Sequence, residues 1–241
     1  MPSANKTFHH ARPWGIAALV SVGIAISYLD RQTLPVAIGE IRRDIPISNQ
    51  AKALLDSAFL LTYGVMYVGG GRLLDRLGTR RGFLIIMIVW SLACASHGLA
   101  IGVGSLAASR LLLGAGEGGG FPAATRVVAE WFPLSERATA MGIINAGTGV
   151  GGIIAPPLIA GVVTTIHLFD LSPWRWVFFL TGALGLVWAI AWTRADLDGL
   201  PMPAQAPNAH QPPVKIATLL RFRDRKSTRL NSSHVSESRM P

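Results

Sequence analysis

Six long apolar segments, separated by short charged stretches, dominate the pattern of hydrophobic and polar positions. They cover residues 14–35, 53–71, 82–99, 105–128, 138–163 and 174–192. About 20 apolar residues are enough to cross a ~30 Å hydrocarbon core as a helix. Helices are favoured over open sheets there because the backbone must satisfy its own hydrogen bonds in lipid. The pattern therefore predicts an all-α membrane protein with six transmembrane helices. The alternative is one large soluble domain with buried helices, which the short charged connections disfavour.

The distribution of charge changes what the basic composition means. The chain of 241 residues has a net charge of +9 and a mean hydropathy of +0.41. A basic chain often binds nucleic acid. Here, however, the excess of basic residues lies in every second connection between the apolar segments, on one side of the predicted membrane. Connections on the other side carry basic residues that acids largely offset, and this asymmetry predicts that both ends are cytoplasmic. The residues on the predicted cytoplasmic side are Lys6, Arg12, Arg76, Arg80, Arg81, Arg126, Arg137 and Arg194.

Composition also divides the chain into regions. We expect a cytoplasmic N-terminus at 1–13, a six-helix transmembrane domain at 14–198 and a central cytoplasmic linker, rich in Pro and Ala, at 199–223. Residues 224–241, beginning DRKSTRLNSSH, have no apolar period and resemble the in-frame translation of a sequencing adapter. We therefore exclude them from functional reasoning and expect the amino-terminal half of a longer membrane protein.

Four ionisable residues lie deep in the first and fourth apolar segments. Asp30 and Arg31 stand in SYLDRQTL, and Arg110 and Glu117 in SRLLLGAGEGGG. Transporter halves are often built from three-helix repeats, in which the first and fourth helices match. Arg110 and Glu117 are seven residues apart, which places them on one helix face. Because intramembrane charges are costly and tend to face a cavity or a partner, these four are candidate site residues. A purely structural ion pair, such as Asp30 with Arg110, is the alternative.

Other polar positions are candidates as well. In the fifth segment, Asn145 and Thr148 are predicted to be buried polar groups beside the site. His97, near the outer end of the third segment, is expected to lie at the membrane interface. The single Cys94 lies within an apolar segment, so an intrachain disulfide is impossible.

The connection between the second and third segments reads GRLLDRLGTRRG. We expect Gly71 to permit tight packing and Asp75 to find cationic partners among the following arginines. Together these residues form a candidate gating loop, although a simple topology anchor would look similar. Its members are Gly71, Asp75, Arg76, Gly78, Arg80 and Arg81.

The same loop resembles the signature G-x-L-x-D-R-x-G-x-R-R of the major facilitator superfamily. The stretches YLDRQTL, RLLLGAGEGGGFPAATRVVAEWFPLSERATAMGIINAGTGVGGIIAPPL and WRWVFFLTGALGLVWAIAW are similar to its anion:cation symporter branch, and within it to bacterial hexuronate and aldonate transporters. The resemblance covers residues 14–223 and implies the amino-terminal half of that fold.

The resemblance implies roles for individual residues. Arg31 would bind the substrate carboxylate, and Asp30 and Glu117 would take part in proton coupling, with Arg110 linked to them. Tyr28 and Tyr63 would line the substrate site, although ordinary aromatic packing explains them too; Asn145 and Thr148 complete the candidate substrate-binding set.

The predicted function is proton-coupled symport of a sugar-acid anion, such as a hexuronate or aldonate, across the bacterial inner membrane. The expected partners are the anion, the proton, the lipid bilayer and a second half of the same transporter. A transporter-like sensor of a sugar acid is the alternative, and a non-enzymatic scaffold subunit would not explain Arg31 with Glu117. The sequence has no metal-ligand cluster, phosphate loop or nucleophile motif. We therefore predict no enzymatic activity, no cofactor or metal, and no nucleic-acid partner.

Overall fold

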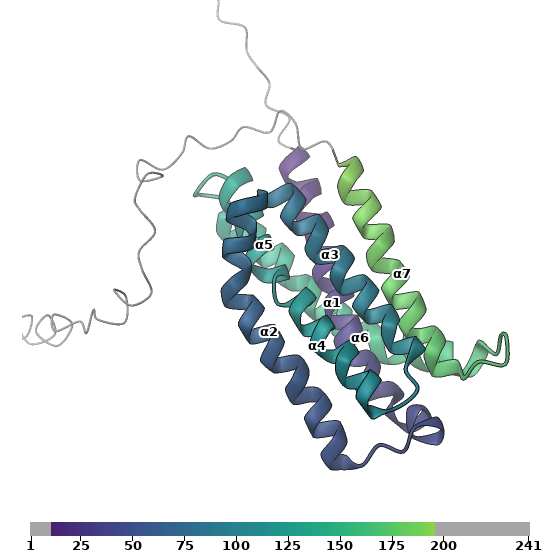
Figure 1. The fold of residues 1–241 in the computed structure, drawn as a ribbon. Coiled ribbons are helices and arrows are strands. Elements are labelled where there is room, and N and C mark those ends of the chain that lie inside the picture. Colours follow the sequence, from purple (N-terminus) through teal and green to yellow (C-terminus); the bar gives the residue numbers. More distant parts are fainter. Residues whose placement is uncertain (1–10, 196–241) are drawn as a thin grey trace, which may run out of the picture. The chain divides into compact units, whose positions relative to one another are not determined.

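The computed structural model of the chain describes residues 11–195, and every regular element among them is a helix. This confirms the all-α fold class. The regions predicted at 199–223 and 224–241, and residues 1–10 of the predicted N-terminal region, lie outside the described residues. In chain order the elements are α1 (Ala11–Asp44), α2 (Asn49–Leu77), α3 (Thr79–Ser96), the 3₁₀ turn η1 (His97–Leu99), α4 (Val103–Glu117), α5 (Gly120–Trp131), α6 (Arg137–Thr165) and α7 (Pro173–Arg194), shown in Figure 1.

Five of the described helices are long and apolar enough to cross a membrane: α1, α2, α3 continued through η1, α6 and α7. The fourth predicted segment is not one helix, because α4 ends at Glu117 after 15 residues and α5 begins at Gly120 with 12. The backbone stays helical between them but tightens, since Gly118 donates to the Gly114 carbonyl and Gly119 to the Gly116 carbonyl. Several consecutive glycines weaken the helix at this point. We treat α4 and α5 in series as the fourth span.

The helices pair as two equivalent three-helix repeats would. α1 packs chiefly on α6, α2 on α4, and α3 on α7. In such repeats α1 corresponds to α4, α2 to α6, and α3 to α7. Under this exchange the α1–α6 pair becomes the α4–α2 pair, and the α3–α7 pair is unchanged. The smaller contacts follow the same exchange, since α1–α7 corresponds to α4–α3 and α2–α3 to α6–α7. The predicted repeat architecture is therefore visible in the packing.

Two pairs of glycines, each four residues apart, bring the main helix pairs into close contact. A Cβ atom at any of them would overlap a backbone carbonyl of the facing helix, so only glycine allows this approach. The glycines are Gly147 and Gly151 of α6, which face Ser21 and Ala25 of α1, and Gly114 and Gly118 of α4, which face Phe59 and Tyr63 of α2.

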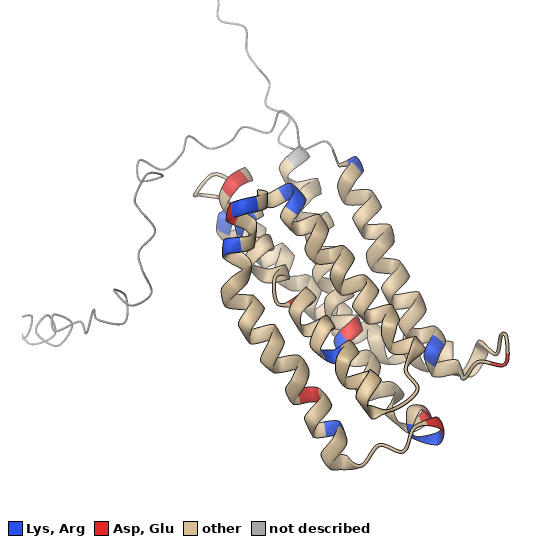
Figure 2. Ribbon diagram, viewed as in Figure 1, with Lys and Arg blue, Asp and Glu red and all other residues tan. Residues whose placement is uncertain are grey.

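Charged residues lie mainly near the two ends of the helices, and a small group lies between the ends (Figure 2). α2 and α6 are the least buried of the spanning helices and expose many large apolar side chains, including Leu61 and Ile153. The buried charges therefore stand out inside an otherwise apolar middle zone, and they define the candidate site.

Candidate functional site

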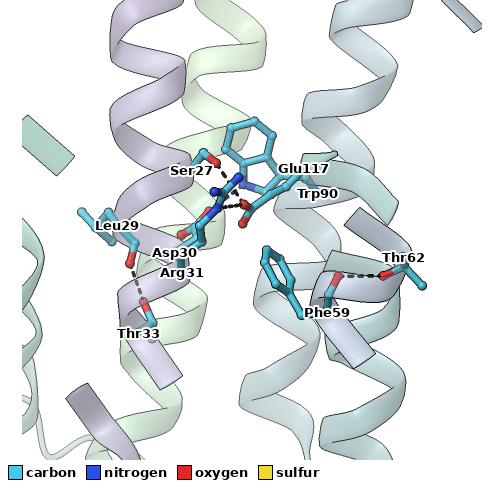
Figure 3. A network of polar contacts seen from close by, with 9 residues as sticks. All are labelled: Ser27, Leu29, Asp30, Arg31, Thr33, Phe59, Thr62, Trp90 and Glu117. Carbon is cyan, nitrogen blue, oxygen red and sulfur yellow. Dashed lines mark hydrogen bonds and ion pairs between the residues drawn. The ribbon is translucent and has the colours of Figure 1, made fainter. Parts of the chain in front are cut away.

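Asp30 and Arg31 are neighbours on α1 and point to different helices. Consecutive helical residues are about 100° apart around the axis, so they cannot share one partner easily. Arg31 Nε donates to Glu117 Oε2 of α4 at 2.6 Å, and Ser27 Oγ donates to the same oxygen at 3.0 Å. Asp30 Oδ2 instead accepts from the indole nitrogen of Trp90 on α3 at 2.6 Å (Figure 3). α1 thus contacts α3 through Asp30 and α4 through Arg31.

Aromatic rings surround the Arg31 guanidinium. Its central carbon lies 4.8 Å from the ring centre of Tyr28, 4.6 Å from that of Tyr63 and 5.7 Å from that of Phe59. Cations at such distances are attracted to aromatic faces. The Arg31 side chain is 23% exposed, whereas that of Glu117 is fully buried. Arg31 is therefore the more accessible member of this ion pair.

Arg110 lies deeper than Arg31. Its side chain is buried, and its Nε and Nη2 atoms have no hydrogen-bond partner within the described part of the chain. Its guanidinium carbon is 5.8 Å from the ring centre of Phe59. Phe59 therefore contacts two guanidinium groups, Arg31 and Arg110. The suggested Asp30–Arg110 ion pair is not formed among residues 11–195, because the Asp30 side of α1 faces α3; the buried ion pair is Arg31–Glu117.

The two acids and two bases formally balance in charge, which lowers the cost of burying them. Each acid still has one oxygen without a hydrogen-bond partner among the described residues, Asp30 Oδ1 and Glu117 Oε1. Such an oxygen is where a carboxylate can accept a proton. Within residues 11–195 no cluster of three or more His, Cys, Asp or Glu side chains could hold a metal ion.

The remaining predicted binding residues have different environments. Tyr28 and Tyr63 are half-buried beside Arg31. The prediction that Asn145 and Thr148 are buried is wrong, since Asn145 is exposed and Thr148 is half-buried. α6 turns Gly147 toward α1, and Asn145 lies two residues earlier, about 200° around the helix. The Thr148 hydroxyl donates to the Asn145 carbonyl at 2.7 Å.

The turn between α2 and α3 depends on Gly78. This residue caps α2 with φ of 74°, a conformation that glycine adopts without strain. The expected tight packing at Gly71 is wrong, because a Cβ there would meet no atom within 4 Å. The adjacent Gly70 has that role, since its Cβ would lie 3.2 Å from the Cα of Gly119.

The charged residues of this turn bind α5 and α7. Asp75 forms an ion pair with Arg126 of α5, which also pairs with Glu130 at 2.7 Å. The expectation that arginines of the loop itself would pair with Asp75 is therefore corrected, because α5 brings a cation to the end of α2. Arg80 donates to the carbonyl of Thr193 near the end of α7 at 3.1 Å. Arg76 and Arg81 are exposed.

The His97 side chain is buried against α7, and its predicted position near the membrane interface stays a prediction. The ring stacks on Phe178 of α7 with centroids 4.9 Å apart, and Nδ1 lies 2.9 Å from the carbonyl of Ala93. α7 covers this end of α3, which sequence position alone does not reveal.

Several contacts in the site involve residues that the sequence analysis did not select. Ser27 is four residues before Arg31, and that spacing places both on one face of α1. Trp90 lies in the middle of an apolar helix, where an indole N–H generally needs a partner. No local pattern indicated that the Phe59 ring would lie near two guanidinium groups.

Comparison with known proteins identifies the family of the chain. The family model described as Major Facilitator Superfamily matches residues 20–230. A galacturonate transporter from Dickeya chrysanthemi is 35% identical over 74% of this chain and 50% of its own length. A hexuronate transporter from Escherichia coli (strain K12) is 35% identical over 74% of this chain and 40% of its own length. The chain thus spans about half or less of the relatives that it matches.

Solved structures give the same fold. A bacterial homologue of the human lysosomal transporter Spinster, in an inward-facing and occupied conformation, matches 80% of this chain and 46% of its own with a TM-score of 0.71 and 22% identity. The transporter FucP, in the outward conformation, matches 88% of this chain and 57% of its own with a TM-score of 0.65 and 18% identity. The family-model match over residues 20–230 confirms the resemblance found in the sequence: the chain belongs to the Major Facilitator Superfamily.

Proposed function

We propose that this chain forms the amino-terminal half of a proton-coupled symporter for an organic anion, with sugar acids as the substrate class. Similar proteins are named as transporters of galacturonate, hexuronate and D-galactonate, all of which carry a carboxylate. The observation that carries the proposal is the Arg31–Glu117 ion pair, which joins a partly exposed cation to a fully buried acid at 2.6 Å.

Arg31 is the proposed binding group for the substrate carboxylate. Its Nε is held by Glu117, and the proposal assigns its two Nη groups to the substrate. Guanidinium groups bind carboxylates through two parallel hydrogen bonds, which a lysine cannot reproduce. The rings of Tyr28 and Tyr63 both lie within cation–π distance of the guanidinium and would help to fix its position. Asn145 and Thr148 would supply polar contacts from α6 to the substrate hydroxyls.

Glu117 is the proposed site where substrate and proton are coupled. A carboxylate that binds Arg31 competes with the Glu117 carboxylate for the same cation. Protonation of Glu117, at the oxygen without a hydrogen-bond partner, would remove the negative charge that competes with the substrate for Arg31, while Glu117 can still accept from Arg31 Nε. Asp30 is the second proposed proton site, and the buried positive charge of Arg110 stabilises the cluster when both acids are ionised. One anion and at least one proton would then cross together.

The turn between α2 and α3 is the proposed gate. Asp75–Arg126 joins α2 to α5, and Arg80 joins α3 to α7, so four helices are tied at one end of the bundle. By the positive-inside rule, the arginines there support a cytoplasmic side for this end and for the N-terminus, and the proposal takes the membrane to be a bacterial inner membrane. Alternating access would break and remake these contacts as this half rocks against a second half.

The test is transport in proteoliposomes by the longer protein that the proposal requires, in which a second six-helix half follows this chain. Glu117→Gln should preserve exchange of labelled for unlabelled hexuronate, because the neutral amide leaves Arg31 free for substrate. Accumulation driven by a pH gradient should be lost. Arg31→Lys should weaken exchange and accumulation together. The 241-residue chain alone is the control and should show no uptake, since it provides one wall of the cavity.

Accumulation by the Glu117→Gln variant in response to a pH gradient would contradict the coupling role of Glu117. Unchanged exchange in Arg31→Lys would contradict the substrate-binding role of Arg31. A protein that binds a sugar acid but neither exchanges nor accumulates it would favour the sensor alternative.

A further inference from the structure

A tight turn connects α6 to α7 at the end of the bundle where α1 also ends. The backbone nitrogen of Leu171 donates to the carbonyl of Leu168 at 3.2 Å, which closes a four-residue β-turn. Its two central residues, Phe169 and Asp170, have φ values of 57° and 51°. Positive φ at both central positions defines a type I′ turn.

The residue at the first central position is unusual for this turn. Type I′ turns favour Asn, Asp and Gly at their centre, because these residues tolerate positive φ. Asp170 meets that preference, but a bulky aromatic residue in the left-handed region is a conformational outlier. A glycine at position 169 would remove the strain. The chain nevertheless keeps a phenyl ring there, which indicates that the ring itself has a use.

The turn presents apolar side chains outward. Phe169 is 81% exposed and Leu168 is 53% exposed. Trp176 of α7 holds the turn in place. Its indole nitrogen donates to the Leu168 carbonyl at 3.3 Å, and its ring centre lies 6.1 Å from that of Phe169. Asp44 at the end of α1 accepts from the Ser172 hydroxyl and from Trp174 Nε1, so the following residues are held as well.

The helices on both sides of the turn place it at the membrane surface. α6 and α7 are each long and apolar enough to span a bilayer, so their connection must emerge at the boundary between lipid and water. Figure 1 shows the connection projecting sideways from the bundle at the end of α7. Aromatic rings with a polar atom, such as Trp176, are enriched at this depth.

We propose that residues 168–171 form an interfacial lipid contact, with Leu168 and Phe169 inserted at the boundary between headgroups and acyl chains. Asp170, at the other central position of the turn, points its carboxylate to the aqueous side. The partner is the lipid leaflet at this end of the bundle, and the contact fixes the level of the α6–α7 end in the membrane. The proposal is independent of any transport activity.

The experiment is spin labelling of the 241-residue chain in phosphatidylethanolamine–phosphatidylglycerol liposomes. A label at Leu168→Cys, with Phe169 in place, is compared with one at Asp170→Cys in the same turn. Ser135→Cys, an exposed site in the connection between α5 and α6, is the reference for a water-exposed label. Cys94 is buried, and the unsubstituted chain measures its background labelling.

The label at 168 should collide more with oxygen than with a water-soluble nickel chelate, and the label at 170 should show the reverse. Adding Phe169→Gly to the Leu168→Cys chain should shift the 168 label toward the nickel chelate, with the helix content unchanged by circular dichroism. Nickel accessibility at 168 equal to that at 135 would overturn the proposal. So would an immobilised label that neither reagent reaches, because protein rather than lipid would then cover the turn.

Discussion

Asp30 and Glu117 lie on matching helices of the two repeats, yet their partners differ. Glu117 accepts from a guanidinium at 2.6 Å and from a hydroxyl at 3.0 Å. Asp30 accepts from one neutral indole at 2.6 Å. Both residues are buried, and each leaves one oxygen without a hydrogen-bond partner among the described residues. The equivalence of the repeats therefore extends to helix packing but not to the chemistry of their acids.

The difference determines what each acid can do. Glu117 cannot become neutral without weakening its ion pair with Arg31, so its protonation changes the availability of that cation. Asp30 can accept a proton on its free oxygen while it keeps the hydrogen bond from Trp90. In the proposed cycle, Glu117 is thus the group that links proton and substrate, and Asp30 can carry a proton independently. Four tests of stability can break or sharpen this comparison.

The largest effect is expected from Glu117→Ala, compared with Asp30→Ala. The first change leaves Arg31 without its counter-charge, which should lower the free energy of unfolding by about 3–5 kcal/mol. The second removes an acid that has no cation as a hydrogen-bond partner and leaves the indole N–H of Trp90 unpaired, so it should cost less, about 1–3 kcal/mol. Unfolding of the chain in micelles, followed by circular dichroism against denaturant, measures both. Equal losses would show that the two acids do not differ in the way that the contacts suggest.

The next effect concerns the approach of α4 to α2, which positions Glu117. A Cβ atom at Gly114 would overlap the carbonyl oxygen of Phe59, and a backbone group can move little. Gly114→Val should therefore cost about 3 kcal/mol, at the upper end for overpacking. Gly71→Val is the matched control, since a Cβ there meets nothing within 4 Å. If both variants lose the same stability, helix propensity rather than close packing explains the result.

The sequence was sufficient for the fold because apolar length and charge asymmetry are local patterns. It also placed Arg31 and Glu117 among four candidates, since charges in apolar segments are rare. It failed where the answer depended on which side of a helix faces a neighbour. Asn145 is two residues from the Gly147 contact and is therefore exposed, and Gly70 rather than Gly71 meets α5. It also predicted one continuous fourth helix, because the apolar pattern runs through residues 118–120. The helix breaks there because consecutive glycines weaken it, an effect that apolar length alone does not reveal.

A smaller effect tests the neutral partner of Asp30. Trp90→Phe keeps an aromatic ring but removes the N–H donor, so Asp30 loses the hydrogen bond to its Oδ2. A hydrogen bond to a charged group contributes about 1.5–3 kcal/mol, and the lower end is expected because the ring packing is retained. Trp174→Phe is the control, since its partner Asp44 is exposed and water can replace the donor. A larger loss for Trp174→Phe would contradict the assignment of Trp90 as the important partner.

The smallest effect should come from the ion pair at the surface, which contrasts with the buried pair of Glu117. Asp75 is 69% exposed where it meets Arg126, so Asp75→Asn should cost at most about 1 kcal/mol. Because exposed charges are screened, that loss should fall toward zero when unfolding is measured at about 1 M salt, where the Debye length is near 3 Å. The loss in Glu117→Ala should persist, since its ion pair is shielded from solvent ions. A cost for Asp75→Asn that stays above about 2 kcal/mol at high salt would show that the turn between α2 and α3 closes this end of the bundle more strongly than an exposed ion pair can.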